Sequence, residues 1–239
     1  MRQHIPHYRR RNFTMRNLSY IIFLIIVLLT SCSDGDHEES TPCSYDIVCL
    51  KEQSDERGSV FSLYRPDGSK EIIYTDPRAV VDLSKISVGD RLMLAYIPHG
   101  IPYESGTITT RGYSTIYNSE LMVSPKGTEN SIEDWRRDGV FLYSIWRSGN
   151  YLNVRARLTY SEESREFLLV VDAADVEARN PVPTVRLVHR MSKPVENFER
   201  QLYSSFDISA LWGQPWIRGI KVELANTNLD TDTFIFIKE

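Results

Sequence analysis

LNVRARLTY, residues 152–160, is the most informative segment of this sequence for the fold class. Its apolar residues occupy every second position from Leu152 to Tyr160, and asparagine, arginine or threonine occupies each position between them. Successive side chains of a β-strand point to opposite faces, so this alternation is typical of a strand with one face in the core and one in solvent. The segment therefore predicts a half-buried antiparallel strand.

Further short apolar segments follow toward the C-terminus, separated by polar stretches. They cover residues 167–171, 184–191, 203–208, 217–224 and 233–237. Short strands at this spacing, without a sustained helical period, are typical of a β-sandwich. We therefore expect residues 136–239 to form an antiparallel β-sandwich domain, preceded by a polar linker at residues 126–135.

The region before this linker also consists of short predicted strands. Residues 60–64 and 71–75 flank Arg65-Pro66-Asp67-Gly68, a turn sequence in which proline presets φ and glycine accepts a positive φ, which predicts a hairpin. RLMLAYI (91–97) is a further apolar run, and residues 113–123 are a further extended segment. About five short strands within residues 44–125 predict a small barrel such as an OB-fold. The predicted fold is thus all-β, with an N-terminal OB-like barrel and a C-terminal β-sandwich.

The N-terminus has the features of an export signal. A cationic segment that ends at Arg16 precedes an uninterrupted apolar run, YIIFLIIVLL, at residues 20–29. A helix that spans a bilayer needs about 20 apolar residues, whereas the apolar region of a signal peptide needs about 7 to 15. Leu29-Thr30-Ser31-Cys32 resembles the lipobox of bacterial lipoproteins, in which the cysteine is acylated and becomes the new N-terminus. We expect residues 1–31 to be cleaved and Cys32 to carry the lipid; an uncleaved anchor is the alternative.

Charge limits the partners of the mature chain. Removal of residues 1–31 takes five of the 28 basic residues and none of the 32 acidic ones, which leaves 23 basic residues and a net charge of −9. An acidic protein repels phosphate backbones and anionic lipid headgroups. We therefore expect no nucleic-acid partner, and we expect membrane attachment to come from the covalent lipid.

The segment behind Cys32 predicts a tether and a location. Residues 32–43 are polar and acidic and contain nothing to bury, which is typical of a disordered linker. An acidic cluster directly behind a lipidated cysteine also resembles the surface-export signal of certain Gram-negative lipoproteins. We expect an outer-membrane lipoprotein whose body is exposed at the cell surface; a body that faces the periplasm is the alternative.

Two further cysteines, Cys43 and Cys49, remain in the exported chain. An oxidising compartment would allow a disulfide between them. If the residues between them are extended, however, the two thiols lie too far apart to bond, so a bridge requires a turn. A disulfide and two independent thiols both stay open.

Four motifs accompany the lipobox and the acidic tether: SVGDRLMLAYI (87–97), NYLNVRARLTY (150–160), FDISAL (206–211) and IKVEL (220–224). Together and in this order, these features resemble the NigD-like lipoprotein family. The resemblance implies an N-terminal OB-like domain and a C-terminal β-sandwich over nearly the whole mature chain. It implies no particular activity, and the family name, taken from a gene beside a bacteriocin operon, suggests a bacteriocin-associated role.

Few residues suggest a ligand site. The sequence has no G-x-S-x-G, H-E-x-x-H, P-loop or G-x-G-x-x-G motif. His99 and Tyr103 lie in a predicted loop, and Trp212 and Trp216 lie in a segment bent by glycine and proline, where exposed rings could contact a glycan or a protein. The alternatives are that His99 only shapes its loop and that both tryptophans fill the end of the sandwich.

Clustered carboxylates suggest calcium only weakly. Oxygen-bearing side chains cluster at Asp172, Asp175 and Glu177 and again between Asn226 and Asp232, but neither run has the pattern of an EF-hand loop. We therefore expect solvated turns, with no metal and no cofactor.

The expected function is a binding or assembly module without catalytic residues, whose partner is a protein or a glycan. The alternative is a hydrolase, for example a carbohydrate-active enzyme that uses two scattered carboxylates about 5 to 9.5 Å apart. Two carboxylates that face each other in a walled cleft would favour the enzyme.

Overall fold

The computed structural model describes residues 42–65, 68, 70–79, 81–82, 84–124, 138–161, 166–190 and 194–238. The predicted signal peptide, Cys32, most of the tether and the predicted linker lie outside these residues. Apart from two short helices, the elements in the described part are β-strands, so the all-β prediction is confirmed. No helix within the described ranges is both long and apolar enough to cross a bilayer.

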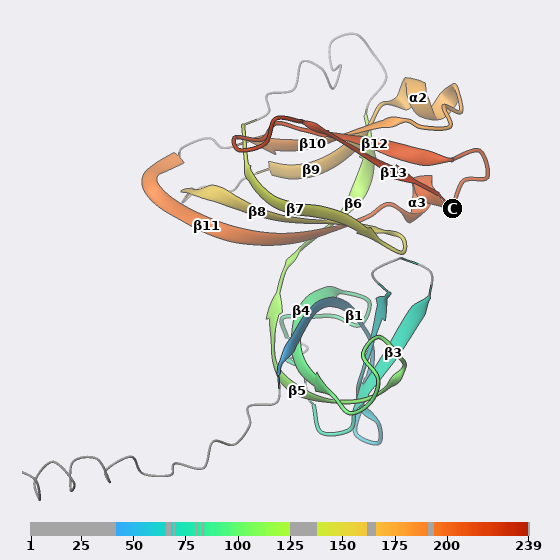
Figure 1. Ribbon diagram of the computed structural model, residues 1–239, viewed down its shortest axis with the longest axis vertical. Helices are drawn as coiled ribbons and strands as arrows, with labels where there is room; N and C mark the ends of the chain where they lie inside the picture. The colour runs from blue at the N-terminus through green and yellow to red at the C-terminus, as the bar shows by residue number, and fades with distance from the viewer. Residues whose placement is uncertain are drawn as a thin grey trace, which may run out of the picture. The chain divides into compact units, whose positions relative to one another are not determined.

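The first five strands close into a barrel (Figure 1). They are β1 (Ser44–Ser54), β2 (Gly58–Tyr64), β3 (Glu71–Asp76), β4 (Arg91–Pro98) and β5 (Gly106–Thr115). Their order is β1-β2-β3-β5-β4, and β1 pairs with β4 to complete the ring. A five-stranded barrel of this kind is the architecture that the OB-like prediction requires. The predicted hairpin is also confirmed, because β2 and β3 pair from Ser59↔Asp76 to Tyr64↔Glu71.

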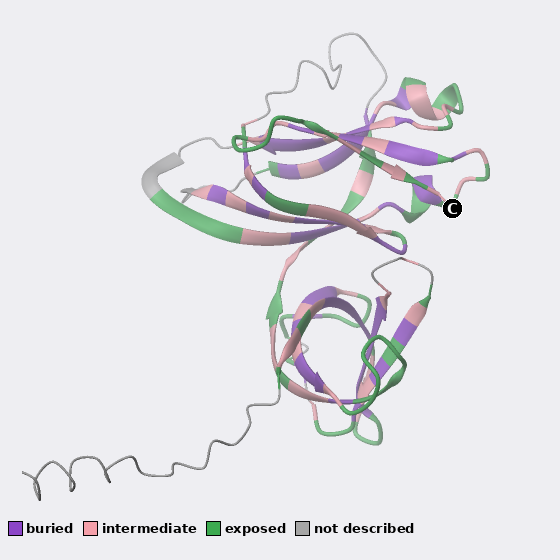
Figure 2. Cartoon of the chain, in the orientation of Figure 1, coloured by how far each residue is buried: buried purple, intermediate pink, exposed green. Residues whose placement is uncertain are grey.

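The barrel core follows from the alternation along its strands. Val48 and Leu50 on β1, Phe61 and Leu63 on β2, and Leu92 on β4 are buried, so residues two apart point to the same interior (Figure 2). Each strand therefore contributes one apolar face to a single closed core.

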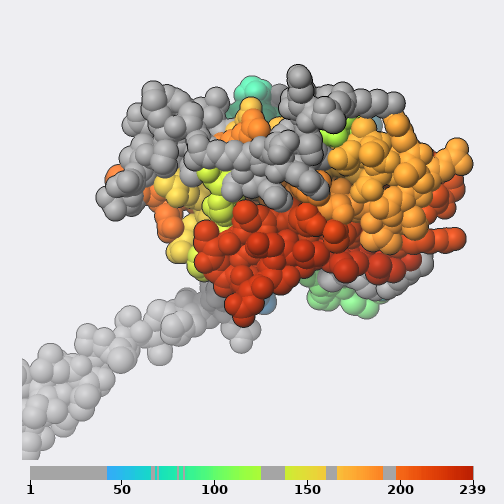
Figure 3. Space-filling view, turned by 90° about the horizontal axis from the view of Figure 1, so that it is seen from above, coloured from blue at the N-terminus to red at the C-terminus, as the bar shows by residue number. Residues whose placement is uncertain are grey.

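The other eight strands form one sheet in the order β13-β12-β10-β9-β6-β11-β8-β7. They are β6 (Tyr117–Val123), β7 (Phe141–Ser148), β8 (Tyr151–Ser161), β9 (Glu166–Val171), β10 (Thr184–Arg190), β11 (Pro194–Asp207), β12 (Gly219–Leu224) and β13 (Thr233–Ile237). The helices α2 (Ala173–Glu177) and α3 (Ser209–Trp212) lie in its connections. In Figure 3 the C-terminal segments, coloured red, form a continuous patch of surface beside the orange segment that contains α2.

This sheet bends so that two layers share one core. Leu152 and Val154 of β8 belong to the same buried cluster as Leu169 of β9 and Val222 of β12. Figure 1 shows β7, β8 and β11 as one layer and β9, β10 and β12 as the other. Strand β6 joins them, because its first half pairs with β11 and its second half with β9. The sheet is therefore sandwich-like, with its apolar faces turned inward.

Two features of the sheet differ from the sequence-based prediction. Residues 117–123 were expected in the barrel domain, but as β6 they pair within the second sheet. Only Ile116 separates β6 from β5, so residues 113–123 read as one extended segment, and periodicity does not record which sheet a strand joins. The sheet is also not wholly antiparallel, because β6–β11, β6–β9 and β10–β12 are parallel pairs.

Strand β7 is a strand that the sequence did not reveal. Its pairing with β8 shifts register between Leu142 and Ser144, which marks a bulge. A bulge inserts an extra residue and breaks the period-two alternation. The apolar residues of β7 therefore do not alternate cleanly, and its pattern was not recognised.

Candidate functional site

A cleft of about 580 Å³ lies where strands of the barrel and of the second sheet meet. Its walls come from β1, β2, β4 and the β4–β5 loop of the barrel, and from β7, β8 and β11 of the sheet. A volume of this size is typical of sites for small ligands, about 300 to 1,000 Å³. The cleft is lined mainly by aromatic residues and arginines: Tyr45, Tyr64, Tyr103, Trp146, Tyr203, Arg65, Arg147 and Arg155.

In the barrel wall of the cleft, hydrogen bonds with two neighbouring residues fix the position of Tyr103. Tyr103 has a φ of 60°, a left-handed conformation that is rare for a bulky residue. Two hydrogen bonds hold it there: its N–H donates to the Tyr74 hydroxyl (3.2 Å), and its carbonyl accepts from Arg65 Nε (3.2 Å). Strained backbone persists only where its surroundings enforce it, and it is common at functional sites.

Asp46 is the one carboxylate among the described residues that line the cleft. The Tyr96 hydroxyl donates a hydrogen bond of 2.8 Å to its Oδ2. Burial raises the pKa of Asp46 above its ordinary value, and this hydrogen bond opposes the rise only in part. Burial also raises the pKa of Tyr96. The negative charge of Asp46 is therefore disfavoured at this position.

The sheet wall presents a row of side chains across three strands. Arg155 on β8 pairs in register with Tyr203 on β11 and with Ser144 on β7. The guanidinium carbon of Arg155 lies 5.5 Å from the ring centroid of Tyr203 and 5.0 Å from that of Tyr143. Both distances are within cation–π range. Two aromatic rings from two other strands thus flank this arginine.

A second arginine of the cleft is fixed by the β7–β8 hairpin. Arg147 Nη1 donates to the Gly149 carbonyl at 2.7 Å, and its guanidinium carbon lies 4.7 Å from the ring centroid of Trp212. Because these contacts restrict its side chain, Arg147 shapes the wall more than it is available to a ligand.

The residues proposed from sequence fall in different places. Tyr103 lines the cleft. His99 is exposed, is not among the residues that line the cleft, and its Nε2 lies 2.7 Å from Thr109 Oγ1. Trp212 is 6 % exposed and belongs to the core of the sheet, and Trp216 is half-buried against that core. Both tryptophans thus pack in or against the core of the second sheet, as in the alternative in which they fill the end of the sandwich.

The disulfide considered from the sequence is not formed. Cys43 and Cys49 are both free, and the chain between them is extended in β1. Six residues of extended strand separate them by about 20 Å, whereas bonded cysteines have Cα atoms about 5.5 Å apart. In this structure the two thiols are therefore independent.

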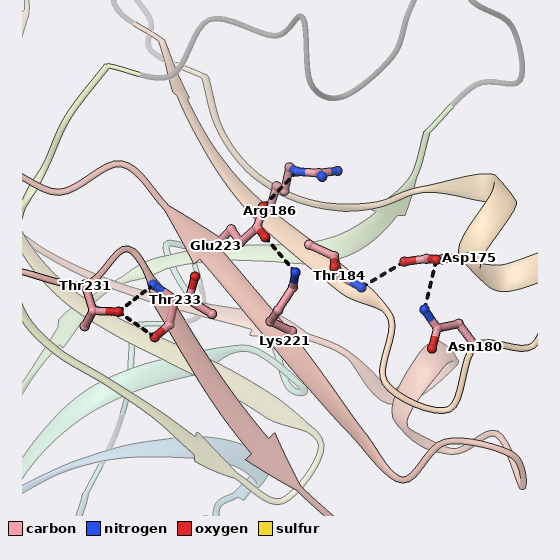
Figure 4. A network of polar contacts seen from close by, with 8 residues as sticks. All are labelled: Asp175, Asn180, Thr184, Arg186, Lys221, Glu223, Thr231 and Thr233. Carbon is pink, nitrogen blue, oxygen red and sulfur yellow. Dashed lines mark hydrogen bonds and ion pairs between the residues drawn. The ribbon is translucent and has the colours of Figure 1, made fainter.

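The clustered carboxylates serve the architecture of the second sheet. Asp172 caps α2, and Asp175 accepts hydrogen bonds from Asn180 Nδ2 (3.0 Å) and from the Thr184 N–H (2.9 Å). Nearby, Glu223 forms ion pairs with Arg186 (3.1 Å) and Lys221 (2.9 Å), as Figure 4 shows. Among the described residues no group of three or more His, Cys, Asp or Glu side chains is arranged to hold a metal ion.

Most residues of the cleft were missed by the sequence analysis. The alternation in residues 152–160 placed Arg155 on the polar face, but it could not identify Tyr203 and Ser144 as its neighbours on adjacent strands. Asp46, Tyr64 and Trp146 carry no local motif. Their role as wall residues follows only from the meeting of distant strands.

The carboxyl groups of the lining bear on the hydrolase alternative. Glycosidases need two carboxyl groups about 5 to 9.5 Å apart across the scissile bond. The described lining of the cleft supplies Asp46 alone, so it holds no such pair. Aromatic faces with a few fixed polar groups are typical of ligand sites.

Solved structures with the same fold come from Bacteroides and Parabacteroides. A protein of unknown function of the DUF1344 family from Bacteroides vulgatus is similar to this chain with a TM-score of 0.64 at 16 % identity, over 83 % of this chain and 92 % of that one. A NigD-like immunity protein from Bacteroides caccae matches with a TM-score of 0.55 at 17 % identity, over 82 % and 97 %. A candidate lipoprotein from Bacteroides fragilis matches with a TM-score of 0.54 at 12 % identity, over 82 % and 96 %.

The comparisons that use sequence alone found no related protein. No protein-family model matches the chain, and no curated protein is significantly similar to it in sequence. The resemblance to NigD-like proteins is confirmed at the level of the fold: this chain has the fold of a NigD-like protein.

Proposed function

We propose that this chain is a lipid-anchored protein of the cell envelope that binds a ligand in the cleft without transforming it. The observation that carries the proposal is the described lining of the cleft, which combines tyrosine and tryptophan faces with arginines and one carboxylate, Asp46. Tyr, Trp and Arg are the residue types enriched where proteins bind partners. The partner class is a glycan or a protein.

The anchor supports an envelope location. Cys32 follows a lipobox-like sequence, and a multiply acylated cysteine binds a bilayer firmly, because each buried methylene contributes about 0.8 kcal/mol. The acidic tether behind Cys32 favours the outer membrane and the cell surface. The similarity in fold to a candidate lipoprotein is consistent with this proposal.

The anchor is tested by labelling cells with a palmitate analogue. We expect label on the natural chain, mass spectrometry that finds Cys32 acylated at the new N-terminus, and protease shaving of whole cells that removes the body. The Cys32→Ser variant should lose the label. Retention of residues 1–31 on the natural chain would contradict the lipid anchor, and protection from protease would contradict surface exposure.

Ligand binding is tested by recovery of partners from envelope extracts with the full chain. Tyr45 lines the cleft and is 68 % exposed, so Tyr45→Ala removes a contact surface with little effect on packing. Phe198→Ala is the matched control, because Phe198 is 64 % exposed and is not a lining residue. Partners that are lost with Tyr45→Ala and kept with Phe198→Ala support the proposal. Equal recovery with both variants contradicts it.

A bacteriocin-associated role is a narrower form of the same proposal. It is motivated by the similarity in fold to a NigD-like immunity protein. Deletion of the gene should then increase sensitivity to a bacteriocin of related strains. Unchanged sensitivity would remove this form and leave the binding proposal in place.

A further inference from the structure

Arg155 is a cation in the cleft for which the described residues provide no acidic partner. Within the part of the chain that the structure describes, its contacts are the rings of Tyr143 and Tyr203, and its Nε is buried without a hydrogen-bond acceptor. A buried donor without an acceptor is unfavourable. A ligand oxygen that accepts a hydrogen bond from it would therefore contribute more binding free energy than one that bonds to a solvent-exposed donor.

Arg157, two residues further along the same face of β8, shows what Arg155 lacks. Its guanidinium carbon also lies over an aromatic ring, 4.2 Å from the centroid of Phe141. Unlike Arg155, it forms an ion pair with Glu199 at 2.9 Å. The two arginines therefore share strand, face, aromatic stacking and a buried Nε without a hydrogen-bond acceptor, but of the two only Arg157 forms an ion pair with a described residue.

The charge balance of the cleft favours an anion at Arg155. Of the three arginines in the lining, Arg65 forms an ion pair with Glu104 at 3.9 Å, and Arg147 is held by the contacts described above. Asp46, the one carboxylate of the described lining, has its pKa raised by burial. The mature chain as a whole is acidic, so the positive charge is local to this site. A planar guanidinium binds a carboxylate through two parallel hydrogen bonds, which suits it to carboxylate recognition.

The rest of the lining favours a ring-shaped ligand. Tyr45 and Trp146 contribute aromatic side chains from opposite walls, and the apolar C–H face of a sugar ring can pack on such faces. The volume of about 580 Å³ is sufficient for a short oligosaccharide.

An acidic peptide fits less well at the strand that borders the cleft. Of the two edge strands of the sheet, β13 and β7, it is β7 that lines the cleft, and a peptide there could extend the sheet through unpaired backbone groups. At Leu142, however, the N–H and the carbonyl of that edge already bond to the side-chain amide of Asn228, at 2.8 and 2.9 Å. Val140 is likewise bonded, to Ala225 and Thr227. The start of this edge is thus covered by the protein itself.

We propose that the cleft binds an acidic saccharide, with a sugar carboxylate on the guanidinium of Arg155 and sugar rings against Tyr45 and Trp146. This inference rests on the proposed function, since it names the ligand class of the same cleft. Arg155 is then the residue that discriminates acidic from neutral glycans.

The test uses the full chain, purified from membranes in a mild detergent, on an array of uronic-acid and sialic-acid oligosaccharides. Each is paired with its carboxyl-reduced counterpart, which keeps the rings and loses the charge, and glutamate-rich peptides form a third arm. We expect binding of at least one acidic glycan, loss of at least tenfold in affinity on carboxyl reduction, and a similar loss in Arg155→Gln. Arg218→Gln, an exposed arginine outside the lining, is the control that should bind normally.

Each other outcome overturns the inference in a distinct way. Equal binding of acidic and reduced glycans removes the role of Arg155 and leaves the cleft as a neutral-glycan site. Binding of peptides in place of glycans replaces the ligand class, and binding of no probe rejects acidic saccharides. The proposed function is then judged separately by the recovery experiment with Tyr45→Ala and Phe198→Ala. If Arg155→Gln does not fold, the comparison of acidic and reduced glycans on the natural chain still decides whether binding requires the sugar carboxylate.

Discussion

Two aspartates of the barrel illustrate how surroundings set the charge of a residue. Asp46 is half-buried beside a tyrosine hydroxyl, and burial raises its pKa. For Asp76, burial also acts to raise the pKa, but backbone N–H groups of Thr110 (2.6 Å) and Arg78 (3.0 Å) outweigh it, so its pKa is lowered. The same residue type therefore affects stability with opposite signs.

We predict opposite pH dependences for Asp46→Asn and Asp76→Asn. Below the ordinary pKa near 3.8, the Asp46 carboxyl is neutral in the folded and the unfolded chain, so the natural chain has its full stability relative to Asp46→Asn. This relative stability is lost as the pH rises through the raised pKa of the folded state, because the buried carboxylate must then ionise. For Asp76 the stabilisation is present above 3.8 and is lost as pH falls through the lowered pKa. Urea denaturation of both variants over an acidic pH series measures this; slopes of equal sign would contradict the assignment.

The two thiols should react at very different rates. Cys49 is 4 % exposed, its Sγ lies 3.3 Å from the Gly89 carbonyl, and burial raises its thiol pKa, whereas Cys43 is half-buried. We predict that iodoacetamide at neutral pH modifies Cys43 in the folded chain and Cys49 only after unfolding. Peptide mass spectrometry without reductant identifies the modified site. Recovery of a Cys43–Cys49 bridge would contradict the free thiols.

At the scale of single elements, the β7–β8 hairpin links strand geometry to the cleft. β7 ends at Ser148 and β8 begins at Tyr151, so Gly149 and Asn150 form a two-residue turn. Gly149 has a φ of +58°, as the first central residue of such turns requires. A Cβ at Gly149 would collide with the ring of Tyr64, which lines the cleft. The turn thus positions both the strand and a wall residue.

We therefore predict that Gly149→Ala destabilises the fold by about 2 kcal/mol or more, because positive φ and steric overlap act together. Gly112→Ala is the control, since Gly112 lies in β5 with open space around its Cβ position, and its effect should stay within about 0.5 kcal/mol. Chemical denaturation of the full chain measures both. Equal destabilisation by the two variants would show that neither the turn nor Tyr64 imposes the constraint.

At the scale of the whole described fold, Arg91 connects the barrel with the second sheet. Arg91 is 3 % exposed, and its Nη2 donates to the Ile47 carbonyl of the barrel and to Asn153 Oδ1 of β8, both at 3.3 Å. Its guanidinium carbon lies 4.1 Å from the ring centroid of Tyr151, and burial lowers the pKa of Arg91 to about 10. Ser205 Oγ donates to the same Asn153 oxygen at 2.8 Å. Among the described residues Arg91 forms no ion pair, so dipoles, a ring and the more distant charge of Asp207 stabilise this buried cation.

A double-mutant cycle between Arg91→Met and Asn153→Ala should reveal this connection. We predict a coupling energy of about 1.5 kcal/mol, because the hydrogen bond involves a charged group in a buried place. The control cycle uses Arg57 and Glu52, an exposed ion pair of 2.9 Å that should couple by about 0.5 kcal/mol or less. Unfolding free energies of the single and double variants supply both values. If the coupling energy of Arg91 and Asn153 is no larger than that of Arg57 and Glu52, Arg91 does not connect the barrel with the second sheet.

Much of the fold could be predicted because alternation is a local property. Residues 233–237 were predicted as a strand and form β13, and the hairpin of β2 and β3 followed from its turn residues. β7 was missed because its bulge breaks the alternation. Of the residues that line the cleft, the sequence predicted Tyr103 as a ligand contact. It placed Arg155 on the polar face of its strand, but gave no sign of a role in binding.

The sequence by itself determined the all-β class, the buried face of β8 and the resemblance to NigD-like proteins, since these depend on residues that are neighbours in the chain. Only the tertiary structure decided that β6 joins the second sheet, that the cysteines stay apart, and that Tyr45 and Tyr203 line one cleft. The physical reason is that strand pairing and charge compensation join residues far apart in sequence. A period of two residues indicates which way a side chain points, but not what it meets.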